Sequence, residues 1–217
     1  MKFPLPKIYP ITDRKLSGLS HADQVRQFAL GGATLVQLRD KSASSGDLYE
    51  SALEAVNAAN EHGIRLLIND RVDIAVLTGA HGVHLGQTDL PAREARKLLG
   101  TEAIIGLSTH TIEQARIAVS EGIADYLAFG PIFETDTKLD HDPLVGTEGL
   151  KAIRVVVDDI PLVAIGGIKR ANLASVLASG ADSVAMISEL YKRQSSLSES
   201  FSDLLKIADN DNLVKRS

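Results

Sequence analysis

The sequence predicts an α/β protein with a single (β/α)8 barrel, the TIM-barrel fold. Short apolar runs rich in β-branched residues alternate with longer segments of helical period, and eight such pairs fit into about 200 residues. The runs are apolar throughout, as expected for parallel strands that are buried on both faces. An open, doubly wound sheet is the competing architecture.

The predicted strands end in polar residues or glycines, where loops begin. Arg39, Asn69 and Ser108 follow the second, third and fifth runs, and Gly166 and Ser188 follow the last two. Because the carboxyl ends of barrel strands share one face, we expect functional side chains there. The predicted strands cover residues 8–12, 34–38, 65–68, 82–85, 103–107, 125–129, 161–165 and 183–187.

The segments between the strands carry helical stripes of apolar residues. Leu48, Ala52, Ala55, Val56 and Ala59 form such a stripe, and glycines stand where several of these segments should end. The predicted helices cover residues 21–30, 46–61, 71–77, 94–99, 111–120, 148–157, 171–178 and 197–207. No linker interrupts this pattern, so we expect one domain over residues 1–217, with its core at about 8–207 and a frayed polar tail at 209–217.

Composition and charge exclude several classes of function. The net charge of −5 offers no basic footprint for nucleic acid, and no stretch approaches the roughly 20 apolar residues of a membrane helix. The chain has no cysteine, and its first residues do not form a signal peptide. We therefore expect a cytoplasmic protein that binds small molecules, not nucleic acid or membrane; the sequence leaves its oligomeric state open.

A cationic cluster follows the second strand. Alternation along an extended chain sends Gln37, Arg39 and Lys41 to one side. Two cations beside an amide in a barrel mouth suit a phosphate or diphosphate. The alternative is a solvated loop with a surface salt bridge.

Two aspartates follow neighbouring strands. Asp70 ends the third strand and Asp89 follows the fourth. Adjacent strands lie about 4.8 Å apart, so the two carboxylates can share one hard cation, and Mg²⁺ is typically held by one or two carboxylates together with substrate phosphates. The alternative is that each aspartate caps a helix. Their position beside Arg39 and Lys41 favours a metal–diphosphate site.

Two further loops suit phosphate. The long loop after the sixth strand, about 130–146, offers Thr135, Thr137 and Lys138, although it could be a mobile surface loop. Gly166-Gly167 and Ile187-Ser188 follow the last two strands, where barrels often bind phosphate through backbone amides.

The histidines show no spacing typical of transition-metal ligands. His84 and His110 lie near strand ends without such partners. We expect His21, His62 and His81 on the surface.

Taken in order, these motifs resemble the thiamine phosphate synthase family over about residues 8–190. The glycine pair alone is not specific, but the set is. The matching segments are Tyr9 to Asp13, Val36 to Lys41, Ile68 to Asp73, Gly82 to Gln87, Gly106 to Thr111, Gly130 to Lys138 and Ala164 to Ile168. The sequence departs from the family pattern at Glu134, where proline is usual, and at Asp40, where glutamate is usual.

The resemblance implies a role for each candidate residue. The residues implied to bind a pyrimidine diphosphate are Gln37, Leu38, Arg39, Asp40, Lys41, Asn69, Ser108 and Lys138, among which Arg39, Lys41, Ser108 and Lys138 would be catalytic. Those implied to bind a thiazole phosphate are Thr135, Asp136, Thr137, Gly167, Ile187 and Ser188. Asp70 and Asp89 would bind Mg²⁺, the implied cofactor.

The implied reaction is formation of a C–N bond with release of pyrophosphate, giving thiamine phosphate. The thiazole nitrogen has no proton to lose, so the reaction needs charge neutralisation on the leaving group and not a general base. A thiazole tautomerase of the same fold and a non-catalytic sensor of a phosphorylated ligand are the alternatives. Neither would need the complete set of cationic and acidic residues.

Overall fold

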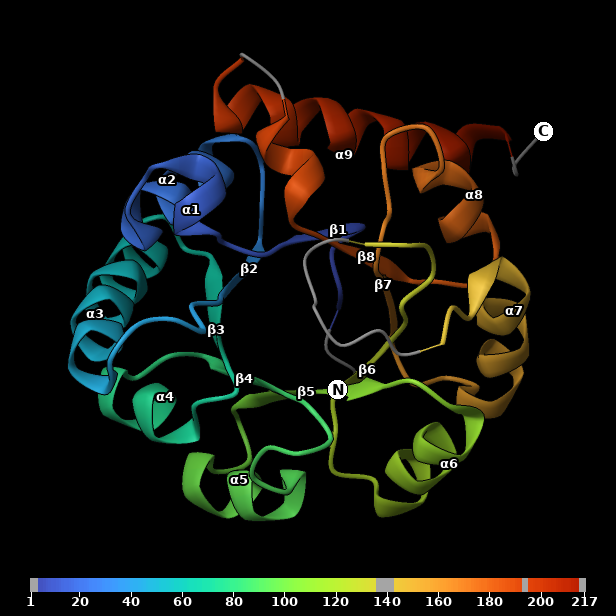
Figure 1. The fold of residues 1–217 in the computed structure, drawn as a ribbon, viewed down its shortest axis with the longest axis horizontal. Coiled ribbons are helices and arrows are strands. Elements are labelled where there is room, and N and C mark those ends of the chain that lie inside the picture. The colour runs from blue at the N-terminus through green and yellow to red at the C-terminus, as the bar shows by residue number, and fades with distance from the viewer. Residues whose placement is uncertain (1–3, 136–142, 193–194, 215–217) are drawn as a thin grey trace.

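The strands of the computed structural model form one parallel barrel (Figure 1). The structure describes residues 4–135, 143–192 and 195–214. The strand order β1-β8-β7-β6-β5-β4-β3-β2 is sequential, and the ring closes where Ile11 bridges to Gln37 and the Thr12 amide donates to the Gln37 carbonyl at 2.9 Å. This closure excludes the doubly wound sheet. The strands are β1 (Ile8–Pro10), β2 (Leu35–Leu38), β3 (Arg65–Asn69), β4 (Gly82–Leu85), β5 (Ile104–Thr109), β6 (Tyr126–Phe129), β7 (Leu162–Ile165) and β8 (Ser183–Met186).

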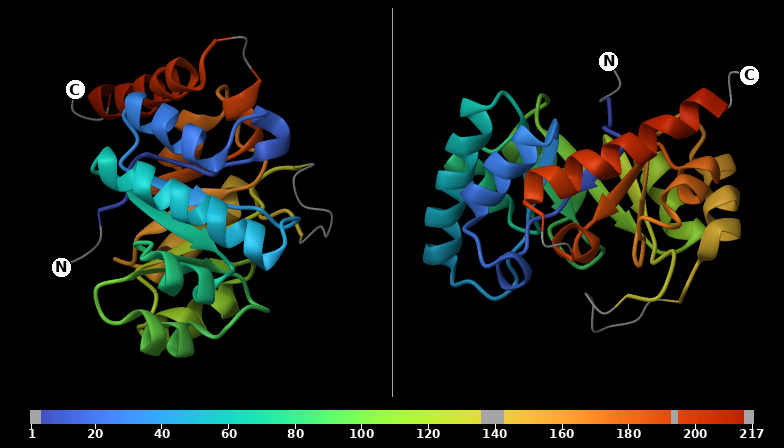
Figure 2. Two further views of the ribbon diagram at one scale, coloured as in Figure 1. Left: turned by 90° about the vertical axis from the view of Figure 1, so that its left-hand side faces the viewer. Right: turned by 90° about the horizontal axis from the view of Figure 1, so that it is seen from above.

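The helices surround the strands (Figures 1 and 2). They are α1 (Arg14–Ser17), α2 (His21–Leu30), α3 (Ser45–Glu61), α4 (Val72–Thr78), α5 (Ala92–Leu99), α6 (Ile112–Glu121), α7 (Gly146–Val157), α8 (Leu173–Ala178), the 3-10 helix η1 (Ser188–Tyr191) and α9 (Leu197–Val214). α9 lies across the outside of α2 and α8 (Figure 1). Within the described ranges, no helix is both long and apolar enough to span a membrane.

Three helical segments differ from the sequence prediction. α1 and η1 were not predicted, because four residues are too few to show a helical period. α9 continues to Val214, so residues 209–214 are helical and not a frayed tail. Buried Phe201, Leu204 and Ala208 form one stripe that anchors this helix to the barrel up to its last turns.

The apolar core has two layers because strand residues alternate between two buried faces. One layer lies between strands and helices and includes Val36, Leu38 and Ile68. The other fills the barrel interior and includes Leu35, Leu67 and Val163. The interior layer forms the floor beneath the carboxyl ends of the strands, so side chains at those ends stand on a packed base.

Candidate active site

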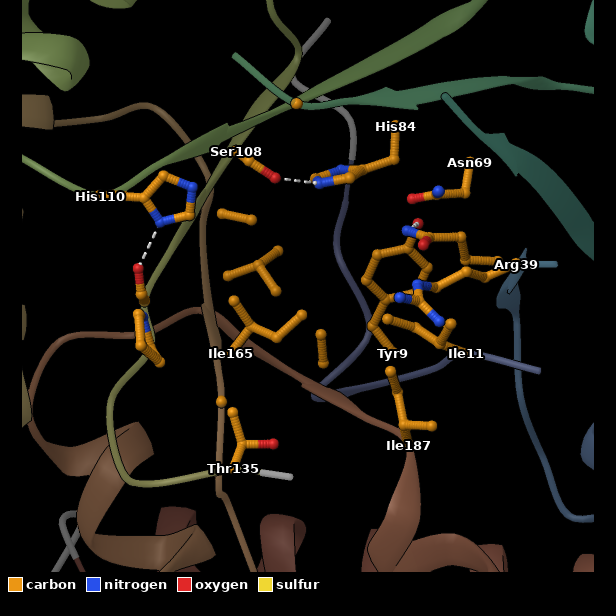
Figure 3. Close-up of a pocket in the computed structure, with 18 of the residues that line it drawn as sticks. Tyr9, Ile11, Arg39, Asn69, His84, Ser108, His110, Thr135, Ile165 and Ile187 are labelled. Carbon is orange, nitrogen blue, oxygen red and sulfur yellow. Dashed lines mark hydrogen bonds between the residues drawn. The ribbon is translucent and has the colours of Figure 1, made fainter. Parts of the chain in front are cut away.

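A cavity of about 530 Å³ opens at the carboxyl ends of the strands (Figure 3). Part of its lining is apolar, with Ile11, Ile165 and Ile187 facing inward, while Arg39 and Asn69 lie on one side (Figure 3). The predicted site residues that line it are Gln37, Arg39, Lys41, Asn69, Asp70, Asp89, Ser108, Thr135, Gly167, Ile187 and Ser188. The fold thus gathers polar groups from most of the strand ends into one space.

The segment after β2 alternates as the sequence predicts. Gln37, Arg39 and Lys41 line the cavity. Leu38 is fully buried in the layer between strands and helices, and Asp40 points away from the cavity to cap the next turn, accepting from the Ser42 amide at 2.9 Å. Burial alone would raise the pKa of Asp40, but the hydrogen bonds from the Ser42 amide and hydroxyl lower it overall. The structure therefore does not bring Leu38 or Asp40 to the proposed ligand.

A buried histidine supports this segment from behind. His21 is 1% exposed, so its predicted surface position is wrong. Its Nδ1 lies 2.7 Å from Thr12 Oγ1, which accepts from the Arg39 amide at 3.3 Å, and its Nε2 lies 3.6 Å from Asp40 Oδ2. The first turn of α2 thereby fixes the backbone that carries Arg39. Sequence reasoning missed this role because it depends on a packing contact between α2 and the loop after β2.

The carboxylates of Asp70 and Asp89 meet at the rim of the cavity. They lie within hydrogen-bonding reach of each other, and Lys41 Nζ is 3.2 Å from Asp70 Oδ2. Burial raises the pKa of Asp89, and the neighbouring Asp70 carboxylate raises it further, against the Gly86 amide that donates to Asp89 Oδ2. Two like charges held this close suit a shared cation.

The alternative reading of these aspartates as helix caps is wrong. Arg71 is the N-cap of α4 and Pro91 is the N-cap of α5, and neither helix has a side-chain cap. Asp70 instead has a left-handed backbone (φ 64°), which is uncommon outside glycine and is found enriched at functional sites. Among the described residues, no group of three or more His, Cys, Asp or Glu could hold a metal ion, so a cation here would need ligand atoms from elsewhere.

The opposite side of the cavity has the glycine turns expected for phosphate. Gly166 and Gly167 have φ values of 103° and 61°. A Cβ at Gly167 would come within 2.3 Å of the Glu134 carbonyl oxygen, so the turn after β7 packs directly against the loop after β6. Glu134 is exposed and does not line the main cavity. Three other residues predicted in that loop, Asp136, Thr137 and Lys138, lie outside the described residues.

His110 connects the ends of β5 and β6. Its Nδ1 lies 2.6 Å from the Gly130 carbonyl oxygen, and because a carbonyl can only accept, Nδ1 carries the proton (Figure 3). The sequence placed His110 near a strand end without assigning it a role. The contact holds the start of the loop that leads to Thr135.

A buried polar chain under the cavity was also missed. It runs from Gln37 through the hydroxyls of Tyr9 and Tyr126 and the ring of His84 to Ser108 (Figure 3 shows its Ser108–His84 end). Burial lowers the pKa of His84 to about 4 although Asp89 opposes this, so the ring is neutral. Burial raises the pKa of both tyrosines, which keep their protons. A period-2 strand pattern marks these side chains as inward-facing, but it does not show that strands β1, β4 and β6 bring them together.

Comparisons with known proteins agree with this geometry. Residues 8–190 match the family described as thiamine monophosphate synthase. A thiamine-phosphate synthase of Chloroflexus aurantiacus is 46% identical over 183 residues, 84% of this chain and 83% of its own length. One of Syntrophomonas wolfei is 48% identical over 184 residues, 84% of this chain and 87% of its own. The solved thiamine phosphate pyrophosphorylase of Pyrococcus furiosus superimposes with a TM-score of 0.83 at 35% identity, covering 94% of this chain and 96% of that one.

Proposed function

The chain belongs to the thiamine monophosphate synthase family and is a thiamine-phosphate synthase, and we propose how its barrel mouth performs that reaction. The substrates are an aminopyrimidine carrying a diphosphooxymethyl group and a thiazole phosphate, in its carboxy or hydroxyethyl form. The products are thiamine phosphate and pyrophosphate. The observation that carries the proposal is the gathering of Arg39, Lys41, Asp70 and Asp89 on one side of the cavity and of Gly167 on the other.

The pyrimidine diphosphate occupies the side formed by β2 to β5 in this proposal. Gln37, Asn69 and Ser108 bind the substrate from the strand ends, and Arg39 and Lys41 neutralise its diphosphate. Lys138, outside the described residues, is a third cation for the leaving group on the strength of the family resemblance alone.

Asp70 and Asp89 fit a Mg²⁺ ion that is shared with the substrate. Their carboxylates face each other, and burial together with the Asp70 charge already disfavours ionised Asp89 without a cation. When bound, Mg²⁺ supplies positive charge to the departing pyrophosphate. Lys41, paired with Asp70 at 3.2 Å, is placed to exchange that carboxylate for a phosphate oxygen.

The chain's own residues supply charge neutralisation and water exclusion, and no base is needed for the thiazole nitrogen. His84 has both ring nitrogens engaged, at 2.9 Å to Tyr126 and 2.8 Å to Ser108, and is neutral with its pKa lowered to about 4 by burial. His110 uses Nδ1 to hold the Gly130 carbonyl. The apolar side chains that line the cavity, Ile11, Ile165 and Ile187, help to keep water from competing with the thiazole.

The thiazole phosphate binds at the turns after β7 and β8. The amides of Gly167 and Ile187 and the hydroxyl of Ser188 are its donors in this proposal, and Thr135 lines the cavity beside the Gly167 turn. The left-handed backbone of Gly167 and its close approach to the Glu134 carbonyl leave no room for a side chain.

Gly167→Ala is expected to raise the KM for the thiazole phosphate by roughly tenfold to a hundredfold, with a smaller effect on the pyrimidine. The added Cβ must displace the Glu134 backbone, which moves the loop carrying Thr135 away from the phosphate. Steady-state kinetics with each substrate varied in turn measure the effect.

Gly122→Ala is the matched control for backbone strain. Gly122 ends α6 with φ 63°, almost the value of Gly167, and a Cβ there meets nothing within 4 Å. It should lose a little stability and keep both KM values. An equal rise of both KM values in Gly167→Ala would count against the assignment of this side to the thiazole phosphate.

Pyrophosphate release in the presence of both substrates tests the proposed function. We expect turnover only with both substrates, and strong dependence on added Mg²⁺. A thiazole tautomerase would convert the thiazole phosphate alone and release no pyrophosphate, and a sensor would bind without turnover. Either result would reject the proposal.

A further inference from the structure

A chain of hydrogen bonds through the barrel interior joins Gln37 to Ser108, two residues that we propose bind the pyrimidine substrate. Gln37 Nε2 donates to the Tyr9 hydroxyl at 2.9 Å, and the Tyr9 and Tyr126 hydroxyls are 3.0 Å apart. The Tyr126 hydroxyl lies 2.9 Å from His84 Nδ1, and His84 Nε2 lies 2.8 Å from Ser108 Oγ. We call these five side chains the relay; only Gln37 and Ser108 were predicted to bind substrate.

Donation from Gln37 to Tyr9 favours one direction along the relay. If each hydroxyl donates its one proton within the relay, Tyr9 donates to Tyr126 and Tyr126 donates to His84 Nδ1. The single proton of a neutral imidazole therefore sits on Nε2 and is donated to Ser108. Ser108 Oγ, already an acceptor, keeps its own proton for a ligand.

The surrounding packing holds the relay rigid. The rings of His84 and Tyr126 stack with centroids 5.6 Å apart, and those of Tyr9 and Tyr126 meet edge to face at 5.9 Å. A Cβ on Gly106 would lie 2.0 Å from Cζ of Tyr126, so only glycine at this position of β5 leaves room for that ring. Buried hydrogen-bond networks that are fully satisfied in this way specify one arrangement.

The direction of the relay determines what the cavity offers a ligand at each end. Because one N–H of Gln37 donates to Tyr9, the amide is held with its nitrogen toward Tyr9 and its oxygen is left as an acceptor for a ligand. At the other end, Ser108 is left as a donor. A 4-aminopyrimidine has the matching functions, an exocyclic N–H donor and ring nitrogen acceptors. A 4-pyrimidinone has the opposite ones, an exocyclic oxygen acceptor and a ring N–H donor.

We propose that Tyr9, Tyr126 and His84 are positioning residues that fix the Nε2–H tautomer of His84 and thereby select an aminopyrimidine over a pyrimidinone. This inference rests on the proposed function, because it assumes that the ligand of this side is a pyrimidine. A pyrimidinone would have to use the second N–H of Gln37 and the second lone pair of Ser108, which would leave the Gln37 amide oxygen and the Ser108 proton without partners. A site that leaves buried polar groups unpaired rejects the wrong ligand strongly.

The tautomer is measured first, in the free protein and without any substrate. In ¹⁵N spectra of histidine-labelled protein, with the His84 signals assigned by their loss in His84→Gln, we expect a protonated Nε2 and an unprotonated Nδ1. Tyr126→Phe removes the group that donates to Nδ1 and should allow both tautomers. A protonated Nδ1 in the wild-type protein would overturn the relay direction.

Binding then tests selectivity. Dissociation constants of the amino and the oxo pyrimidine diphosphates are measured by calorimetry without thiazole phosphate, so that their different reactivities play no part. We expect the wild-type preference for the amino compound to fall by about tenfold or more in Tyr126→Phe. Tyr9→Phe disconnects the relay from Gln37 and should show the same loss of preference. It serves as the test variant if Tyr126→Phe fails to fold.

Tyr49→Phe is the matched control, since Tyr49 lies on α3 outside the cavity and its variant should keep the full preference. An unchanged preference in both relay variants would overturn the proposal even if their stability falls. Failure of the wild-type protein to bind the aminopyrimidine would instead reject the proposed function. The tautomer measurement needs no ligand, so it would still test the relay direction in that case.

Discussion

Replacing Asp70 or Asp89 by asparagine is expected to lower kcat/KM by about 10²-fold or more, the scale of losing a group that stabilises transition-state charge. Each change removes one of the two carboxylates proposed for Mg²⁺, and it should also raise the Mg²⁺ concentration needed for half-maximal rate. Asparagine tolerates the left-handed backbone of Asp70, and at position 89 it can still accept from the Gly86 amide. The measurement is the initial rate over a Mg²⁺ titration.

The fold should survive these changes. The pKa of Asp89 is raised above its ordinary value by burial and by Asp70. The carboxylate therefore binds a proton more tightly in the folded state than in the unfolded state. Stability linked to this group is therefore lost as the pH rises above its unfolded pKa. At neutral pH without metal, Asp89→Asn should melt at the same temperature as the wild type or higher.

Asp73→Asn is the control for charge. Asp73 lies three residues from Asp70 on α4, pairs with Arg71 at 2.6 Å and does not line the cavity. It should keep normal activity and Mg²⁺ dependence. Near-normal activity of Asp70→Asn or Asp89→Asn at limiting Mg²⁺ would remove that residue from the metal site.

An electron-withdrawing substituent on the pyrimidine is expected to slow the chemical step by orders of magnitude. In the proposed binding mode, Arg39 and Lys41 supply positive charge to the diphosphate, while His84, which also lines the cavity, is neutral with both ring nitrogens engaged. This distribution suits departure of pyrophosphate before the thiazole attacks. The intermediate would be a pyrimidine methylene cation stabilised by the ring amino group, which a withdrawing substituent disfavours.

Single-turnover kinetics at saturating thiazole phosphate separate this step from product release. The substituted pyrimidine should bind with nearly unchanged affinity, because its diphosphate contacts are the same. A concerted displacement would respond far less, since the incoming nitrogen would share the charge. A rate that does not vary with ring electronics would therefore reject the stepwise mechanism and leave the overall reaction in place.

Much of the fold was predictable because its signals are local. Each predicted strand agrees with the structure to within two residues at either end, and the helices that span several turns were also predicted, since both depend on the spacing of apolar residues along the chain. The inward direction of Gln37, Arg39 and Lys41 was predictable for the same reason, as was the gathering of strand ends at one face. The sequence did not predict the four-residue helices α1 and η1, which are too short to show a period.

By itself, then, the sequence determined the barrel, the face that carries the site, the family and the residues that follow each strand. Only the tertiary structure decided which of those residues meet: that Asp70 and Asp89 face each other instead of capping helices, that Asp40 turns to its own loop, and that His21 is buried behind it. It alone revealed the relay, whose members come from β1, β2, β4, β5 and β6. The physical reason is that periodicity fixes the face on which a side chain lies, whereas a hydrogen bond between distant strands depends on barrel closure, register and the space that Gly106 leaves for Tyr126.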